Sequence, residues 1–166
     1  MDEPEPPAVG EDAPGFTAPV ADSDGITPRS LGEYLGETPT VLAFFPAAFS
    51  GTCTEELCTF RDRLDPLANE AATVLGISTD LPWALAEFRE EESLPFPLAA
   101  DNDAAVCDAY GVRTRYDRFG IDDVARRSVF VLDADGTVTY RWLAGDPGVE
   151  PDYPTVADAI RNAAGD

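Results

Sequence analysis

The feature that most constrains the fold of this chain is a continuous apolar run at residues 40–45, TVLAFF, which Pro46 ends. A strand with no polar face is typical of a sheet that is covered on both sides. Directly after it, apolar residues recur at helical spacing from about residue 52 to residue 69. A central strand that leads at once into a helix places the connecting turn at a helix N-terminus, where active sites often lie.

The same alternation of apolar runs and amphipathic segments continues along the chain. A strand-and-turn region precedes residue 36, and the turn at 133–136 joins two strands as a hairpin. Further strands are predicted at 73–78, 97–99, 127–132 and 137–143, and further helices at 81–92, 103–110 and 155–164. This order predicts an α/β fold with a central mixed sheet flanked by helices. It resembles the thioredoxin fold with an N-terminal hairpin extension and an inserted strand–helix unit.

Three details of these elements are open to direct test. The short segment 97–99 is typical of a strand at the edge of a sheet. Leu81 is expected on the buried face of its helix, because its spacing from the apolar residues that follow is helical. Asp101 or Asn102 is expected to cap the helix at 103–110.

The two ends of the chain differ in composition. Residues 1–14 are acidic and rich in proline, which predicts a disordered arm before a single domain at residues 15–166. No apolar run approaches the ~18 residues of a membrane-spanning helix. The first residues also lack the basic and then apolar layout of a signal peptide, so a cytoplasmic location is expected.

Charge excludes several partners. The 32 acidic residues outnumber 11 basic residues, all of them arginine, and the net charge is -21. Such a chain repels nucleic acids and anionic membranes, so neither is expected as a partner. The acidic residues are dispersed among periodic apolar ones, which predicts a folded domain with an acidic surface like that of proteins adapted to high salt. The alternative is an ordinary acidic protein from a lysine-poor genome.

The content of histidine and cysteine limits the chemistry. The chain has no histidine, which excludes Ser–His–Asp and Cys–His nucleophile systems and histidine zinc sites. Its three cysteines, Cys53, Cys58 and Cys107, form no recognisable zinc pattern, and we expect neither a metal ion nor a cofactor. An odd number of cysteines argues against a framework of structural disulfides and leaves thiol chemistry open.

Cys53 falls in the first turn of the helix that follows the apolar run. The positive end of the helix dipole and the unpaired backbone amides there favour a thiolate over a thiol. Ser50 is near enough for its hydroxyl to bond the sulfur or a bound oxygen, and Pro46 can shield the pocket from water. The same residues are also consistent with Cys53 as a small buried side chain, so both interpretations stay open at this point.

At these positions the chain resembles the peroxiredoxins, the alkyl hydroperoxide reductase and thiol-specific antioxidant family. That family carries Pro-x-x-x-Thr/Ser-x-x-Cys at the end of a core strand, and Pro46, Ser50 and Cys53 match the motif. A second match is Arg127 at the start of RSVFVLD. Arg126 beside it is expected to be a solvated charge, although a slip of one residue would exchange the two. The resemblance covers roughly residues 15–146.

The cysteine pattern is most similar to that of the bacterioferritin-comigratory-protein branch of the family. The resemblance implies that Cys53 attacks a peroxide and becomes a sulfenic acid, with Arg127 and Ser50 stabilising the charge that moves. It also implies Cys58 as the resolving cysteine, with Cys107 as the alternative. A dithiol reductant such as a thioredoxin or a glutaredoxin-like protein would restore the enzyme, which would be a monomer or a homodimer.

Two other functions are compatible with parts of this pattern. A thioredoxin-like dithiol oxidoreductase would have Cys-x-x-Cys at the helix start, whereas four residues separate Cys53 from Cys58. A non-enzymatic redox sensor on the same fold would oxidise once at Cys53 without turnover.

Overall fold

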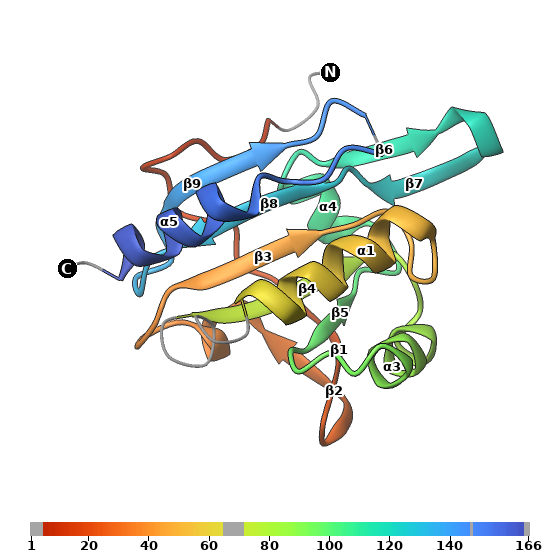
Figure 1. Cartoon of the computed structure of the whole chain (residues 1–166), viewed down its shortest axis with the longest axis horizontal. Helices are drawn as coiled ribbons and strands as arrows, with labels where there is room; N and C mark the ends of the chain where they lie inside the picture. Colours follow the sequence, from red (N-terminus) through yellow and green to blue (C-terminus); the bar gives the residue numbers. More distant parts are fainter. Residues whose placement is uncertain (1–4, 65–71, 147, 165–166) are drawn as a thin grey trace.

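The computed structural model describes residues 5–64, 72–146 and 148–164. Its main feature is a mixed sheet in the order β2-β1-β5-β4-β3-β8-β9, with a two-stranded hairpin of β6 (Arg113–Tyr116) and β7 (Ile121–Ala125) beside it (Figure 1). The sheet strands are β1 (Thr17–Asp22), β2 (Gly25–Ser30), β3 (Thr40–Phe44), β4 (Thr73–Ser78), β5 (Leu98–Ala100), β8 (Ser128–Leu132) and β9 (Val138–Leu143). The arrangement confirms the predicted α/β fold with a central mixed sheet flanked by helices.

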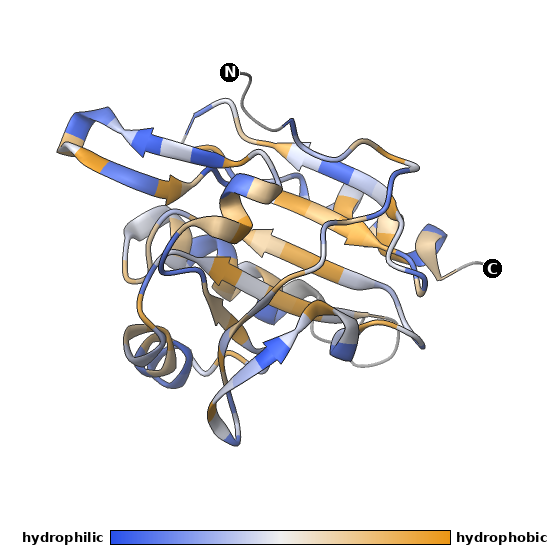
Figure 2. Cartoon of the chain, turned by 180° about the vertical axis from the view of Figure 1, so that it is seen from behind, coloured by the Kyte–Doolittle hydropathy of each residue, from blue (hydrophilic) through white to orange (hydrophobic). Residues whose placement is uncertain are grey.

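The predicted apolar run forms the central strand, β3. It pairs in parallel with β4 and antiparallel with β8, so both of its edges are hydrogen bonded within the sheet. Every residue of β3 and of β8 is buried, which explains why neither strand has a polar face. Figure 2 shows hydrophobic residues gathered on these central strands.

Helices cover both faces of the sheet and divide the core into two clusters. Val41 and Ala43 of β3 pack on one face with residues of α1, α3 and α5, whereas Leu42 and Phe44 pack on the other face with residues of α4. Successive side chains of a strand point to opposite faces, so the two clusters are separated by the sheet itself. The helices are α1 (Gly51–Thr59), α3 (Pro82–Glu91), α4 (Ala105–Ala109) and α5 (Tyr153–Ala163).

The helix predicted over residues 52–69 is shorter as an α-helix. It continues beyond α1 as a π-helical segment, Phe60–Leu64, and residues 65–69 lie outside the described residues. Wide turns of this kind are rare and are frequent near functional sites. This π-helical segment is relevant here because it continues α1, and α1 carries two of the three cysteines.

Two of the three local predictions were wrong. β5 lies between β1 and β4 rather than at an edge, because the N-terminal hairpin adds β1 and β2 outside it. Leu81 is 53% exposed, because it precedes the first turn of α3 and lies outside the helix's buried stripe. The third prediction was confirmed for Asp101: the residue before α4 is Ala104 in a left-handed conformation (φ 60°), but the Asp101 carboxylate caps the helix by accepting hydrogen bonds from the Val106 and Cys107 amides of its first turn.

The hairpin of β6 (Arg113–Tyr116) and β7 (Ile121–Ala125) was not predicted from the sequence. Most of its residues are exposed, and charged side chains interrupt the alternation that identifies a half-buried strand. The hairpin matters because it lines a cavity that Arg127 also lines. Figure 1 shows it extending beside the start of β8.

The N-terminal segment lies against β9 over residues 5–14, where the sequence predicts disorder. The Gly10 amide donates to the Val138 carbonyl, and the Val138 amide donates to the Glu11 carbonyl. Arg141 adds a hydrogen bond to the Pro6 carbonyl. These backbone bonds account for the order of an acidic segment that has few apolar side chains to bury. Within the described part of the chain, no helix is long and apolar enough to span a membrane.

Candidate active site

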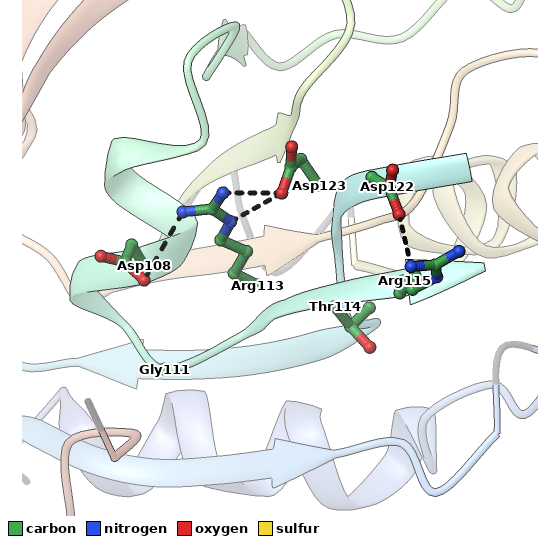
Figure 3. A pocket seen from close by; sticks show the side chains of 7 residues that line it. All are labelled: Asp108, Gly111, Arg113, Thr114, Arg115, Asp122 and Asp123. Atoms are coloured by element: carbon green, nitrogen blue, oxygen red, sulfur yellow. Dashed lines mark hydrogen bonds and ion pairs between the residues drawn. The ribbon is translucent and has the colours of Figure 1, made fainter. Parts of the chain in front are cut away.

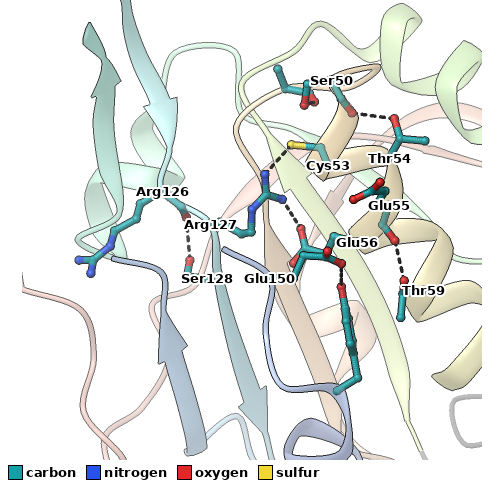
Figure 4. A network of polar contacts seen from close by, with 12 residues as sticks. Ser50, Cys53, Thr54, Glu55, Glu56, Thr59, Arg126, Arg127, Ser128 and Glu150 are labelled. Atoms are coloured by element: carbon teal, nitrogen blue, oxygen red, sulfur yellow. Dashed lines mark hydrogen bonds and ion pairs between the residues drawn. The ribbon is translucent and has the colours of Figure 1, made fainter. Parts of the chain in front are cut away.

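The turn between β3 and α1 places Cys53 in the first turn of the helix (Figure 4). Ser50 is the residue that precedes the first helical turn, and its carbonyl accepts the first helical hydrogen bond, from the Thr54 amide. The Cys53 side chain is fully buried in the cluster formed by α1, α3 and α5. The sulfur therefore faces the positive end of the helix dipole in a site that excludes bulk water.

Arg127 is the charged partner of this sulfur. It immediately precedes β8, whose first residue, Ser128, pairs with Phe44 at the end of β3. Because the end of β3 leads into the Cys53 turn, this pairing brings Arg127 beside α1. Its Nη2 atom donates a hydrogen bond to Cys53 Sγ over 3.1 Å. Two residues 74 positions apart in the sequence thus meet in one buried contact.

Glu56 completes a buried line of three groups. Arg127 Nη1 donates to Glu56 Oε1 over 2.6 Å, and both side chains are fully buried. Burial raises the pKa of Glu56 to about 7, the positive charge of Arg127 opposes this shift, and the Glu150 carboxylate adds to it. The second oxygen, Oε2, is buried without a hydrogen-bond partner among the described residues. The sequence predicted no role for Glu56.

Ser50 makes a different contact from the one predicted. Its Oγ atom donates to the Ala47 carbonyl over 2.9 Å, so the hydroxyl stabilises the turn and is not bonded to the sulfur. Pro46 lines a small cavity that Arg127 also lines. Of the predicted motif, the structure therefore joins Cys53 directly to Arg127, places Pro46 in the wall of this cavity, and uses the Ser50 hydroxyl within the turn.

The turn itself is held from a neighbouring strand. Asp80, just after β4, accepts a hydrogen bond from the Ala48 amide over 2.8 Å and another from the Ser78 hydroxyl over 2.7 Å. Phe49 has a positive φ of 69°, an unusual conformation for a bulky residue, and its ring packs against Phe88 at 5.0 Å between centroids. These contacts fix the turn although Phe49 carries local strain.

Cys58 lies on the same helix, five residues beyond Cys53. Its Sγ atom donates a hydrogen bond to Glu92 Oε1 over 3.3 Å, and the side chain is half-buried. Burial raises the pKa of this thiol, and the hydrogen bond to Glu92 raises it further. Arg61 Nη1 also donates to the Glu92 carbonyl, so two contacts attach the end of α1 to the end of α3.

Cys107 occupies a different environment. It lies in α4 within the cluster on the opposite face of the sheet from Cys53. Its amide donates to Asp101 Oδ2 over 2.7 Å, and burial raises the pKa of its thiol well above the ordinary range. Among the described residues, no cluster of cysteine and carboxylate side chains is suited to hold a metal ion.

Arg126 is separated from this site although it is adjacent in sequence. Figure 4 shows its side chain extending away from Arg127 and Cys53. Its Nε atom donates to the Ala144 carbonyl over 2.7 Å. Arg127, and not Arg126, is therefore the arginine in contact with the sulfur.

Comparison with known proteins identifies the class to which this fold and site belong. The family model described as AhpC/TSA family matches residues 9–141. The chain is 36% identical to the peroxiredoxin Bcp of Escherichia coli over 136 residues, which cover 81% of this chain and 85% of that protein. It also resembles the crystal structure of peroxidoxin BcpB from Mycobacterium tuberculosis, with a TM-score of 0.81, 30% identity, and coverage of 94% of this chain and 97% of the other.

The chain therefore belongs to the AhpC/TSA family of peroxiredoxins, on the Bcp branch. AhpC of Mycobacterium tuberculosis shares the fold, with a TM-score of 0.81 at 20% identity over 96% of this chain and 94% of the other. As a member of this family, the protein is a thiol-dependent peroxidase, which reduces peroxides through a cysteine sulfenic acid.

Proposed function

We propose that Cys53 is the peroxidatic cysteine and that Arg127 stabilises its thiolate. The observation that carries this proposal is the 3.1 Å contact between Arg127 Nη2 and Cys53 Sγ inside a buried site at a helix start. The thiolate attacks one peroxide oxygen, and the O–O bond breaks as the S–O bond forms. Sulfur is oxidised to sulfenic acid, and the leaving oxygen takes a proton to become water or an alcohol.

In this proposal, negative charge moves from the sulfur to the leaving oxygen. Arg127 keeps its charge at any relevant pH and offers several donors, so it serves both atoms as the reaction proceeds. Pro46 shields the site from water, and the Ser50 hydroxyl stabilises the turn. Peroxide consumption with a recycling dithiol is the test. A peroxidase turns over, a sensor stops after one equivalent, and a dithiol oxidoreductase acts on disulfides without peroxide.

We propose Cys58, rather than Cys107, as the cysteine that resolves the sulfenic acid. Cys58 shares a helix with Cys53, whereas Cys107 lies on the far side of the sheet. In the resolving step the Cys58 sulfur attacks the Cys53 sulfenic acid, a disulfide forms and water leaves. A thioredoxin or glutaredoxin-like dithiol then reduces the disulfide, so the reductant is oxidised in its place.

Formation of this disulfide requires α1 to unwind. Five residues along an ideal helix separate two Cα atoms by about 8.6 Å, whereas a disulfide tolerates about 4.4–6.8 Å. Unwinding must also break the Cys58–Glu92 and Arg61–Glu92 contacts. We therefore expect protein treated with one equivalent of peroxide to contain a Cys53–Cys58 disulfide together with a loss of helical signal in circular dichroism.

Peptide mapping after alkylation measures the linkage, and Cys107→Ser is the matched control. That variant should form the same disulfide at the same rate, while Cys58→Ser should accumulate sulfenic or sulfinic acid at Cys53. A Cys53–Cys107 cross-link in the wild-type protein would instead identify Cys107 as the resolving residue. A disulfide formed without any change in helical signal would contradict the unwinding step.

We further propose a cytoplasmic, salt-adapted enzyme that acts as a monomer or a homodimer. Three free thiols suit a reducing compartment. The excess of 32 acidic over 11 basic residues supports the adaptation to salt, because concentrated counterions screen the mutual repulsion of an acidic surface.

The salt proposal gives a stability prediction. We expect the melting temperature to rise by roughly 5 °C or more between dilute buffer and molar potassium chloride, equivalent to about 1–2 kcal/mol for a chain of this length. The rise should be steepest at low salt, since the Debye length falls from about 10 Å at 0.1 M to about 3 Å at 1 M. Differential scanning calorimetry measures it, and a flat or falling melting temperature would contradict the proposal.

A further inference from the structure

Cys58 lies in an environment that differs from those of the other two cysteines. A cysteine inside a protein commonly packs as a small hydrophobic side chain. Among the described residues, the two hydrophobic clusters contain Cys53 and Cys107 and do not contain Cys58. Its half-buried thiol instead donates a hydrogen bond to a carboxylate oxygen, Glu92 Oε1, over 3.3 Å. This contact joins α1 to the end of α3, so apolar packing alone does not explain the position of Cys58.

Carboxylates elsewhere in the chain pair with arginines. Figure 3 shows Arg113 between Asp108 and Asp123, and Arg115 beside Asp122. The corresponding ion pairs include Arg113–Asp123 at 2.7 Å and Arg115–Asp122 at 3.1 Å. Because opposite charges attract, an arginine that lies near a carboxylate is expected to pair with it in the same way.

The Glu92 carboxylate is bonded to a thiol although an arginine lies close by. Arg61 Nε donates to Asp62 Oδ1 over 2.8 Å, and its Nη1 atom donates to the main-chain carbonyl of Glu92. The last carbonyls of a helix have no partner within the helix, so Arg61 satisfies one of them at the end of α3. Arg61 thereby fixes the Glu92 backbone, and the carboxylate of the same residue accepts the hydrogen bond of Cys58.

The two helices joined by this contact have different roles in the reaction. α3 is anchored, because the Glu92 amide donates to the Phe88 carbonyl over 3.0 Å and the Phe88 side chain is fully buried. α1 has to unwind before Cys58 can reach Cys53. The Cys58–Glu92 hydrogen bond therefore holds the part that moves on the part that stays, and it must break before the two sulfurs meet.

The carboxylate also favours the unreactive form of Cys58. Burial raises the pKa of this thiol, the hydrogen bond to Glu92 raises it further, and the negative charges of Glu92 and Asp62 act in the same direction. The positive charge of Arg61 opposes them. The thiolate is the form that attacks another sulfur, so Cys58 on Glu92 is both distant from Cys53 and protonated.

We propose that Glu92 is a positioning residue of the resolving step, which holds Cys58 away from Cys53 and so sets the lifetime of the sulfenic acid. The inference rests on the proposed roles of Cys53 and Cys58. Two reactions compete for the sulfenic acid. In the first, the Cys58 sulfur attacks it, a disulfide forms and water leaves.

In the second reaction, the sulfenic sulfur attacks another peroxide molecule. A second S–O bond forms as the O–O bond breaks, and the leaving oxygen takes a proton to become water or an alcohol. The sulfur is oxidised to sulfinic acid while the peroxide is reduced. This reaction depends on the peroxide concentration, whereas the resolving step does not, so a longer lifetime of the sulfenic acid favours over-oxidation.

Glu92→Ala and Glu92→Gln test the proposal, and Glu91→Gln is the control because it removes the same charge from an exposed neighbour in α3. Each reduced protein is mixed with one equivalent of hydrogen peroxide, quenched with an alkylating reagent at successive times and analysed by mass spectrometry. We expect the rate constant for formation of the Cys53–Cys58 disulfide to rise about fivefold in Glu92→Ala, which is the effect of losing one hydrogen bond. The rise should be smaller in Glu92→Gln, whose amide oxygen still accepts a hydrogen bond, and Glu91→Gln should resemble the wild type.

Two further measurements separate this role from a general loosening of the fold. The peroxide concentration that converts half of Cys53 to sulfinic acid in one turnover should rise by the same factor as the rate constant for the disulfide, because the ratio of the two competing rates defines it. The pH profile for alkylation of Cys58 in the reduced protein should shift to lower pH in Glu92→Gln, since the charge that raises its pKa is removed, and should keep its wild-type position in Glu91→Gln.

An unchanged or lower rate constant for the disulfide in both Glu92 variants would overturn the proposal, as would an equal rise in Glu91→Gln. An alkylation profile of Cys58 that does not move in Glu92→Gln would also overturn it. A failure of the roles on which the inference rests is seen separately, in proteins that retain Glu92. A Cys53–Cys107 disulfide in the wild type would contradict the role of Cys58, and reaction of Cys53→Ser with hydrogen peroxide would contradict that of Cys53.

Discussion

Replacement of Cys53 by serine is expected to abolish peroxide reduction while the protein stays folded. The hydroxyl of serine is a poor nucleophile and is not ionised beside Arg127 at neutral pH, so no S–O bond can form. The substitution changes one buried atom for a smaller one, and the side chain packs among residues of α1, α3 and α5 that remain in place. Peroxide consumption with a dithiol reductant measures the loss, and circular dichroism verifies the fold.

Cys107→Ser is the appropriate comparison, because it makes the same replacement at a buried cysteine on the other face of the sheet. It should retain the wild-type rate constant with hydrogen peroxide. More than trace activity in Cys53→Ser would show that the nucleophile is a different residue. Loss of activity in both variants, with both folded, would show that Cys107 is also needed for peroxide reduction, although it lies on the other face of the sheet.

The central strands could be predicted because their sequences are short continuous apolar runs, which are typical of buried strands. β3 and β8 are apolar at every position after their first residues, Thr40 and Ser128, and β4 was predicted with the bounds that it has, Thr73–Ser78. Sheet order is different, because it depends on pairing between distant segments. β5 was therefore assigned to an edge, which only the packing of β1 against it could exclude.

In the candidate site, too, the residues of one local segment could be predicted, whereas contacts between distant segments could not be predicted from local sequence. Pro46, Ser50 and Cys53 lie within one turn, so their spacing in sequence was enough to group them. The contact of Arg127 with Cys53 depended on resemblance to a family, since no local pattern relates residues 74 positions apart. Asp80 could not be found at all, because its role in holding the turn depends on the parallel pairing of β3 with β4.

Figure 4 shows how the buried charges depend on one another: Arg127 lies between Cys53 and Glu56, with Glu150 beyond. Its guanidinium has a carboxylate on one side and the sulfur on the other. Glu56 therefore offsets the cost of burying an arginine, and the arginine's Nη2 atom donates to the sulfur. Removal of Arg127 leaves the Glu56 carboxylate buried without its positive partner, and breaking a typical buried pair costs about 3–5 kcal/mol.

Replacement of Arg127 by glutamine is consequently expected to lower both the reaction rate and the stability. The rate constant with hydrogen peroxide should fall by about 10²–10³-fold, as when one preorganised donor is removed from an oxyanion site. Glutamine keeps a hydrogen-bond donor of similar shape but has no charge to stabilise the thiolate or the leaving oxygen. Arg126→Gln, whose side chain extends away from the sulfur, is the matched control and should keep its rate with hydrogen peroxide.

The loss of stability should depend on pH, with a sign set by Glu56. Its pKa in the folded protein, about 7, lies above the ordinary value of 4.5, so this group destabilises the fold progressively as pH rises from 4.5 through 7. Without the opposing charge of Arg127 that pKa rises further, and the deficit of Arg127→Gln relative to wild type should grow above pH 7. Urea unfolding at several pH values measures the deficit.

The double variant Arg127→Gln with Glu56→Gln separates the two effects. Because it removes the uncompensated carboxylate, it should regain most of the stability and lose the pH-dependent deficit, while its reaction with hydrogen peroxide remains as slow as in Arg127→Gln. A double variant that recovers the rate would mean that the single substitution acts by distorting the site and not by removing charge from the sulfur. A single variant with wild-type kinetics would remove Arg127 from the mechanism.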